Sequence, residues 1–216
     1  MVYYALLDAS GLNRDDISNL RLKLEKHFIY TDALRKDESV IAKALLCILL
    51  ERCYKIIDFT VDCNANGKPF IIESEISFNI SHSEKFILCV AGDEKLGCDI
   101  EVIRDYNPKV AKRFFTDAEY KLLEASRDKS YDFTRMWTLK ESVLKFSGDG
   151  IPGGLDRYCF SEYYNKDSFI FGDLCFNQLE ADNYIASICS EKGCISQLFV
   201  NIDDIKNAIL NERGTL

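Results

Sequence analysis

Gly97-Cys98-Asp99-Ile100-Glu101 is the first of two stretches that decide how this chain is interpreted. The second lies downstream and reads Trp137-Thr138-Leu139-Lys140-Glu141-Ser142-Val143-Leu144-Lys145. The first stretch has the alternation of a strand, which points Asp99 and Glu101 to the same face. The second has helical spacing, in which Trp137, Glu141 and Lys145 lie near one stripe and Lys140 lies beside it. The two stretches therefore predict three carboxylates and two lysines for one site.

Three carboxylates in one place call for a cation. Neighbouring carboxylates repel each other, and away from bulk water this repulsion is costly unless a cation lies between them. Magnesium prefers oxygen ligands and combines a few protein carboxylates with waters and substrate phosphates. We therefore predict a metal site with Asp99, Glu101 and Glu141 as ligands. The plainer alternative is a solvated strand edge and ordinary surface pairs on a helix.

Further short motifs accompany these two stretches. They are Asn66-Gly67-Lys68-Pro69, Phe78-Asn79-Ile80-Ser81-His82-Ser83, and Lys112-Arg113-Phe114-Phe115 followed by Glu119-Tyr120. Together with Gly-x-Asp-x-Glu and Trp-x-x-Lys-Glu-Ser-x-x-Lys, they resemble the 4′-phosphopantetheinyl transferases of the Sfp type. The matches follow the family's order from about Lys43 to Lys145, whereas the ends of the chain contribute little.

The resemblance implies both an activity and a fold. Such an enzyme uses Mg2+ to transfer the 4′-phosphopantetheine arm of coenzyme A to a serine of an acyl or peptidyl carrier protein, releasing adenosine 3′,5′-bisphosphate. The implied fold is α+β, with two similar α+β halves related by a pseudo-twofold and the active site at their interface. We place the halves at 1–105 and 106–216, because the Tyr106-Asn107-Pro108 turn is the best boundary signal. Asp99 and Glu101 would then come from the first half and Glu141 from the second.

The expected roles of the site residues follow from the same resemblance and from charge. Glu141, Lys145 and Asp99 are expected to be catalytic, and Glu141 could also accept the serine proton directly or through water. Lys140 and Lys145 would offset charge on the pyrophosphate. The expected coenzyme A-binding residues are Lys43, Lys68, Ser81, His82, Lys140 and Lys145. Four of these residues also have a purely structural explanation. Lys43 could extend along the surface of its helix, Lys68 could be an exposed lysine in a turn, and Ser81 and His82 could belong to a turn capped by hydroxyl groups.

Composition limits the other possibilities. At 216 residues with 47% apolar content, the chain suits one large or two small globular domains. It has no apolar run of membrane-spanning length, and its first residues resemble a strand and not a signal peptide, so we expect a cytoplasmic protein that needs no membrane. The net charge of −8 argues against a nucleic-acid partner. Nine cysteines without a Cys-x-x-Cys pair, and only two histidines, predict free thiols and no zinc site.

A basic stripe is expected on the helix that begins at Pro108. Lys109, Lys112 and Arg113 stand at offsets of three and four, and Val110 and Phe114 lie on another side. Since carrier proteins of this kind are usually acidic, the stripe could steer one to a protein that is itself acidic. The alternative is a solvated helix face.

Two other functions stay open, and the secondary structure is predicted only in outline. A different magnesium-dependent phosphotransferase or phosphodiesterase could use the same carboxylates, and a non-catalytic module could simply bind coenzyme A. We expect a monomer, because the two halves would complete one site. The pattern predicts helices over 15–28, 37–54, 108–115, 117–125 and 131–147, and strands over 3–8, 68–72, 77–80, 86–91, 97–103, 158–160, 168–171, 174–177, 184–189 and 196–201.

Overall fold

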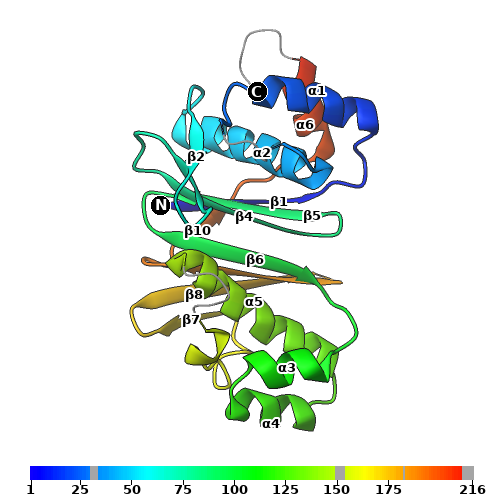
Figure 1. Cartoon of the computed structure of the whole chain (residues 1–216), viewed down its shortest axis with the longest axis vertical. Coiled ribbons are helices and arrows are strands. Elements are labelled where there is room, and N and C mark those ends of the chain that lie inside the picture. The colour runs from blue at the N-terminus through cyan, green and yellow to red at the C-terminus, as the bar shows by residue number, and fades with distance from the viewer. Residues whose placement is uncertain (30–33, 149–153, 182, 211–216) are drawn as a thin grey trace. The chain divides into compact units, whose positions relative to one another are not determined.

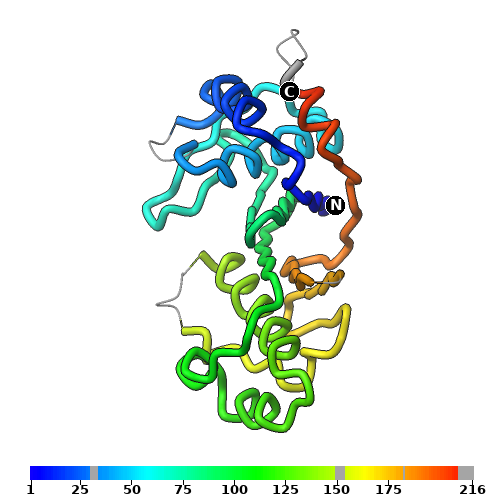
Figure 2. The backbone as a smooth tube through the Cα atoms, turned by 90° about the vertical axis from the view of Figure 1, so that its right-hand side faces the viewer, coloured from blue at the N-terminus to red at the C-terminus, as the bar shows by residue number. Residues whose placement is uncertain are grey.

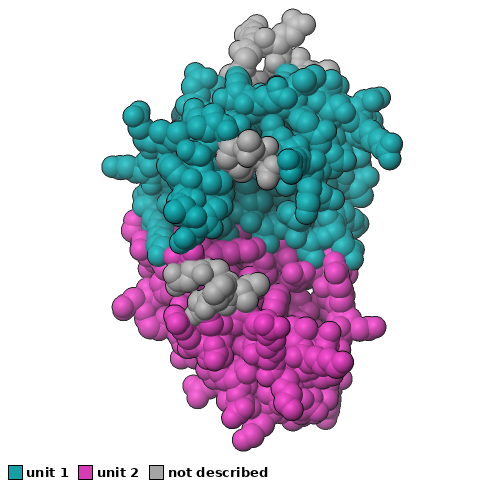
Figure 3. Space-filling model, in the orientation of Figure 1, with its two compact units in different colours: residues 1–95, 194–216 teal, residues 96–193 magenta. Residues whose placement is uncertain are grey.

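The computed structural model describes residues 1–29, 34–148, 154–181 and 183–210. These residues form six α-helices and ten strands, with helices packed on separate antiparallel-rich sheets, which confirms the α+β class. Contacts between Cα atoms divide the chain into unit 1, residues 1–95 and 194–216, and unit 2, residues 96–193 (Figure 3). The predicted pseudo-twofold relation between the halves, with the active site at their interface, stays a prediction.

Unit 1 is built on a four-stranded sheet with the order β10-β1-β5-β4. β1 runs antiparallel to β5 and parallel to β10. Helices α1, α2 and α6 lie together beyond one face of this sheet (Figure 1), and α2 contacts β1, β4 and β5 directly. The bounds of these elements are β1 Val2–Asp8, α1 Arg14–Leu24, α2 Asp37–Leu49, β4 Ser77–Ser83, β5 Phe86–Gly92, β10 Ile195–Gln197 and α6 Ile202–Leu210.

Helix α2 is the centre of the unit 1 core. Every residue from Val40 to Leu49 is buried, so α2 is covered on all sides and not only along one stripe. The helix continues as a π-helix over Leu50–Tyr54 and ends where Lys55 adopts a left-handed backbone with φ 61°. A small hairpin of β2 (Val61–Cys63) and β3 (Pro69–Ile71) packs beside this core.

Unit 2 is built on an antiparallel sheet with the order β6-β9-β8-β7. The long helix α5 crosses one face of it and packs most closely on β6 and β9, while α3 and α4 lie on the far side of α5 (Figure 1). Two apolar clusters result, one between α5 and the sheet and one between α5, α3 and α4. The bounds are β6 Leu96–Val102, α3 Pro108–Phe114, α4 Asp117–Ala125, α5 Lys129–Ser147, β7 Ser168–Phe171, β8 Leu174–Ala181 and β9 Tyr184–Ser190.

The two units differ from the expected halves, 1–105 and 106–216, at both ends of unit 2. β6 pairs with β9 along its whole length, which draws residues 96–105 into unit 2. From residue 194 the chain returns to unit 1, because β10 adds to the edge of β1 and α6 packs against α1 (Figure 2). Asp99 and Glu101 therefore belong to the same unit as Glu141, and not to different halves as expected.

Several element predictions are wrong in instructive ways. The strand expected over 158–160 is not formed, and a 3-10 turn over Leu155–Arg157 precedes it instead. β2 and α6 were not predicted. β2 has only three residues, too few to show alternation, and α6 begins at Ile202, directly after the strand expected over 196–201, where the structure forms only the short β10. Ser81, His82 and Ser83 do not follow β4, as expected for a turn, but form its last three residues.

Two predictions drawn from composition can be compared with the structure. All nine cysteines are free thiols, as predicted. Among the described residues, none of the helices combines the length and the apolar character that a bilayer crossing requires.

Gly97 allows α5 to lie directly against β6. A Cβ atom at this position would stand 2.3 Å from the carbonyl oxygen of Ser142 and 2.3 Å from the amide nitrogen of Phe146. Both atoms belong to the backbone of α5, so a side chain at Gly97 could be accommodated only by moving the helix.

We predict that Gly97→Ala lowers the free energy of unfolding by at least about 3 kcal/mol, because the new methyl group overpacks against backbone. The measurement is unfolding in urea, followed by a signal from unit 2 such as the fluorescence of Trp137. Gly172→Ala is the control, because Gly172 has φ +61° but open space around the missing Cβ. It should cost only about 1 to 2 kcal/mol, the price of the left-handed backbone alone. Equal losses in the two variants would contradict close packing at Gly97.

Candidate functional site

The predicted acidic residues of β6 and α5 form one cluster in unit 2. Lys145 Nζ lies 2.7 Å from Asp99 Oδ1, in an ion pair that joins α5 to β6. Asp99 is almost fully buried, with 4% exposure, whereas Glu101 and Glu141 are half-buried. The charges of Asp99, Glu101 and Lys145 all act on Glu141, so the structure brings these four predicted site residues together.

The pKa values in the cluster respond to burial and to these charges. Burial raises the pKa of the Glu141 carboxyl, and the negative charges of Asp99 and Glu101 raise it further, against the opposing charge of Lys145. For Lys145, burial works against the ammonium, but the charge of Asp99 and the hydrogen bond to it outweigh burial and raise the pKa. The cluster thus carries more negative than positive charge.

This excess of negative charge suits an added hard cation. Glu141 Oε1 is buried, and it accepts no hydrogen bond from any residue that the structure describes. The atoms of the cluster that could bind a metal ion are all carboxylate oxygens, the ligand type that Mg2+ prefers. With the side chains as they stand, the described part of the chain contains no group of three or more His, Cys, Asp or Glu residues arranged around one metal-sized point. The chemistry of the cluster fits a magnesium ion, whereas a complete ligand shell is not formed in advance.

A cavity of about 230 Å³ opens beside Glu101. Its walls include the rings of Phe133 and Trp137, which stack with their centroids 5.7 Å apart, and its rim includes Arg104 and Asn107. Trp137 also packs on Phe114 and Phe115. The acidic cluster therefore borders a cavity with an aromatic wall and a polar rim.

Lys140 has a different environment from the one its motif suggests. It has no solvent exposure, and its Nζ lies 2.9 Å from Glu119 Oε2. The same amine donates hydrogen bonds to the carbonyl oxygens of Leu155, at 2.8 Å, and Tyr158, at 2.5 Å. Burial lowers the pKa of Lys140, and the carboxylate of Glu119 partly offsets this effect. The amine is therefore used inside the protein.

Sequence reasoning did not assign a role to Glu119. The residue is the third of α4 and completes a capping box with Thr116, whose backbone N–H donates to Glu119 Oε2 at 2.8 Å. Its other oxygen accepts a hydrogen bond from the backbone N–H of Phe160 at 2.8 Å. The Thr116-x-x-Glu119 spacing could have identified the cap, but nothing in the sequence points to the contact with Lys140.

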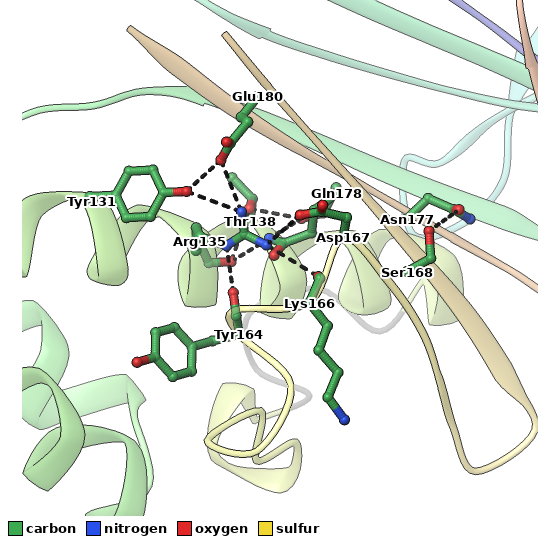
Figure 4. A network of polar contacts seen from close by, with 11 residues as sticks. Tyr131, Arg135, Thr138, Tyr164, Lys166, Asp167, Ser168, Asn177, Gln178 and Glu180 are labelled. Atoms are coloured by element: carbon green, nitrogen blue, oxygen red, sulfur yellow. Dashed lines mark hydrogen bonds and ion pairs between the residues drawn. The ribbon is translucent and has the colours of Figure 1, made fainter. Parts of the chain in front are cut away.

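A second buried cation, Arg135, anchors the first half of α5 (Figure 4). It donates one hydrogen bond from Nε and two from each terminal nitrogen, to acceptors in Tyr131, Tyr164, Lys166, Asp167 and Glu180. Thr138 and Gln178 both bond to the hydroxyl of Ser187, which lies opposite Asp99 in the β6–β9 ladder. These contacts fix α5 on the sheet beside the acidic cluster, and the sequence gives no pattern for them.

The remaining predicted site residues lie in unit 1. Lys43 is on α2 with 8% exposure, its Nζ lies 5.5 Å from the centre of the Phe28 ring, and burial lowers its pKa to about 8. Lys68 directly precedes β3, and its backbone N–H donates to Asn64 Oδ1 at 2.9 Å, which closes the turn around Gly67. In β4, Ser81 is buried and the side chain of His82 is exposed. Their expected role in binding coenzyme A stays a prediction.

The chain is also similar to known proteins. Residues 95–189 match the model of the 4′-phosphopantetheinyl transferase superfamily. The chain is 39% identical over 90 residues to the 4′-phosphopantetheinyl transferase gsp of Aneurinibacillus migulanus, over 41% of this chain and 38% of that protein. It is 32% identical over 143 residues to the 4′-phosphopantetheinyl transferase Sfp of Bacillus subtilis (strain 168), over 64% of this chain and 62% of that protein. With HetI of Nostoc sp., also a 4′-phosphopantetheinyl transferase, identity is 40% over 99 residues, or 42% of each chain.

These matches span from 38% to 62% of the length of the three relatives. The family model covers the part of the chain that places Asp99 and Glu101 on β6 and Glu141 and Lys145 on α5. Residues 95–189 of the chain are therefore similar to the 4′-phosphopantetheinyl transferase superfamily.

Proposed function

We propose that this protein transfers the 4′-phosphopantetheine arm of coenzyme A to a serine hydroxyl of an acyl or peptidyl carrier protein. The observation that carries the proposal is the cluster of Asp99, Glu101, Glu141 and Lys145 within the region that matches the transferase family. The names of the relatives support the same activity, since each is a 4′-phosphopantetheinyl transferase. The second product is adenosine 3′,5′-bisphosphate.

The transfer exchanges one phosphorus–oxygen bond for another. The serine oxygen bonds to the phosphorus that bears pantetheine, and the bond from that phosphorus to the bridging oxygen of the pyrophosphate breaks. The serine proton passes to Glu141, directly or through water, and the departing bisphosphate takes the electron pair of the broken bond.

Charge neutralisation is the other requirement of the reaction. We propose Asp99, Glu101 and Glu141 as the ligands of Mg2+, which would supply positive charge next to the phosphate oxygens. Lys145 adds a fixed positive charge, held in place by Asp99. Lys43, Lys68, Ser81 and His82 are proposed to bind the phosphates and the nucleotide of coenzyme A. The cavity beside Glu101 offers an apolar wall for the pantetheine arm.

The direct test of the proposal is the intact mass of an apo-carrier protein after incubation with this protein, coenzyme A and Mg2+. A gain equal to one phosphopantetheine group supports it. Turnover of a nucleotide or phosphoester without any carrier would instead favour another magnesium-dependent phosphotransferase or phosphodiesterase. Binding of coenzyme A without transfer, unaffected by Glu141→Gln, would favour a non-catalytic binding module. Activity that persists when the protein is diluted as a monomer would support the expectation that no second subunit is needed.

We predict opposite effects of Glu141→Gln and Asp99→Asn on stability, although both should reduce transfer by at least about a hundredfold. Glu141→Gln should leave thermal stability unchanged or raise it, because it removes a buried carboxylate whose Oε1 has no hydrogen bond among the described residues. Asp99→Asn should lower stability, since it takes the ionic partner from Lys145. Thermal unfolding and the carrier mass assay measure the two effects. Transfer that continues in excess chelator would contradict the metal-dependent mechanism.

The basic stripe on α3 generates a prediction about carrier binding. Lys109, Lys112 and Arg113 are all exposed, as predicted, whereas Ala111 of the same helix is buried. Reversing Lys112 and Arg113 to Glu should raise the carrier KM about tenfold and weaken its salt dependence, while kcat and coenzyme A binding change little.

The control for this charge reversal is a second pair of exposed cations. Lys121 of α4 and Arg127 are exposed outside the stripe, and reversing both changes the net charge by the same amount. If both double variants raise the carrier KM equally, overall charge is responsible, and the stripe is not the docking surface.

A further inference from the structure

Glu119 and Lys140 form a fully buried ion pair that the proposed reaction does not use. Both side chains have no solvent exposure. Lys140 has three N–H groups, and three acceptors surround them, namely the carboxylate of Glu119 and the carbonyl oxygens of Leu155 and Tyr158. With every donor taken up inside unit 2, the ammonium is not available to a phosphate of coenzyme A.

Glu119 is equally well satisfied. Its Oε2 accepts hydrogen bonds from the backbone N–H of Thr116 at 2.8 Å and from the Thr116 hydroxyl at 2.9 Å, in addition to the contact with Lys140. Its Oε1 accepts the N–H of Phe160 at 2.8 Å. This single carboxylate therefore connects the start of α4, the middle of α5 and the segment that leads to β7.

The ion pair also lies between the two apolar clusters of unit 2. Phe115 belongs to the cluster formed by α3, α4 and α5, and Phe160 belongs to the cluster between α5 and the sheet. Lys140 Nζ lies 5.4 Å from the centre of the Phe115 ring, and Glu119 bonds to the backbone of Phe160. Apolar contacts are not directional, whereas this set of hydrogen bonds has a fixed geometry and defines how the two clusters meet.

We propose that Glu119 and Lys140 are positioning residues that fix the carrier-docking helix α3 relative to Glu141. The proposal rests on the proposed function, in which α3 receives the carrier and Glu141 acts on its serine. Glu141 directly follows Lys140 on α5, and α3 is joined through Phe115 to Thr116, which Glu119 binds. Loss of the pair would let α3 and α4 shift against α5, so the carrier serine would meet Glu141 less often in the right place.

The experiment compares Lys140→Met, Glu119→Gln and the double variant with a matched control, Arg135→Met. Arg135 is another buried cation of α5, but its hydrogen-bond acceptors lie in Tyr131 of α5, in the 164–167 segment and in β8, and none of them belongs to α3 or α4. Four quantities are measured well below the unfolding temperature: the carrier KM, kcat, the Kd of coenzyme A by calorimetry, and the midpoint of urea unfolding.

We expect Lys140→Met to raise the carrier KM about tenfold, with a coenzyme A Kd within about twofold of wild type. The double variant should recover much of the lost stability, because it leaves no buried charge unpaired, yet keep the raised carrier KM. Arg135→Met should lose stability without this change in the carrier KM. If Lys140→Met fails to fold, Glu119→Gln and the double variant provide the same comparison.

Two results would overturn the proposal. A coenzyme A Kd weakened about tenfold in Lys140→Met, with the carrier KM unchanged, would mean that the lysine binds phosphate. If the carrier KM and kcat change in proportion to the loss of stability in every variant, Arg135→Met included, the pair only stabilises the fold. A failure of the proposed function is distinguishable, because the wild-type protein would then leave the carrier mass unchanged.

Discussion

The contact between α5 and β6 at Gly97 is the constraint on which the rest of unit 2 depends. The two backbones approach so closely that a Cβ at Gly97 would stand 2.3 Å from Ser142 O. Because the two backbones lie so close together, the side chains of β6 and α5 that flank this contact must be small, or must form a hydrogen bond or an ion pair between the two elements. Asp99 lies two residues along β6 and meets Lys145 from α5, while Ser187 of the neighbouring strand meets Thr138. The acidic cluster is thus a consequence of how closely a helix and a strand can pack.

The described part of unit 2 contains three groups of buried charged residues, which differ in how completely their polar atoms are hydrogen-bonded. Arg135 and the Glu119–Lys140 pair direct their donors at acceptors inside the unit, and hydrogen-bonded ionic groups of this kind tolerate burial. The third group, around Glu141, has a carboxylate oxygen that accepts no hydrogen bond from described residues. An incompletely satisfied buried group is unfavourable for folding alone. This unsatisfied carboxylate oxygen separates Glu141, which is proposed to act on substrate, from Arg135, Glu119 and Lys140, which hold α5.

The sequence predicts which acidic residues lie close together better than it predicts the contacts that support them. Alternation in β6 and helical spacing in α5 correctly predict that Asp99, Glu101, Glu141 and Lys145 come together, because both periodicities are local properties of the chain. The partner of Lys140 depends on the fold of residues some twenty positions away, which no local pattern specifies. The same limit explains the unit boundary, since the pairing of β6 with β9 and of β1 with β10 joins segments far apart in sequence. Even the spacing Trp-x-x-Lys-Glu does not show which of its two charged residues faces inward.

The faces of helix α5 contact different parts of unit 2, and this determines which residue of the motif points inward. Thr138 and Ser142 face the sheet, where only small or hydrogen-bonding side chains fit near Gly97 and Ser187. Lys140 faces α4 and the 155–160 segment. Trp137, Glu141 and Lys145 share the remaining stripe, beside β6 and the cavity at Glu101. Since adjacent positions of a helix point in different directions, neighbouring charged residues such as Lys140 and Glu141 can serve unrelated purposes, one inside the protein and one in the proposed reaction. The nine-residue motif from Trp137 to Lys145 is therefore constrained at most of its positions, but by three different sets of neighbours.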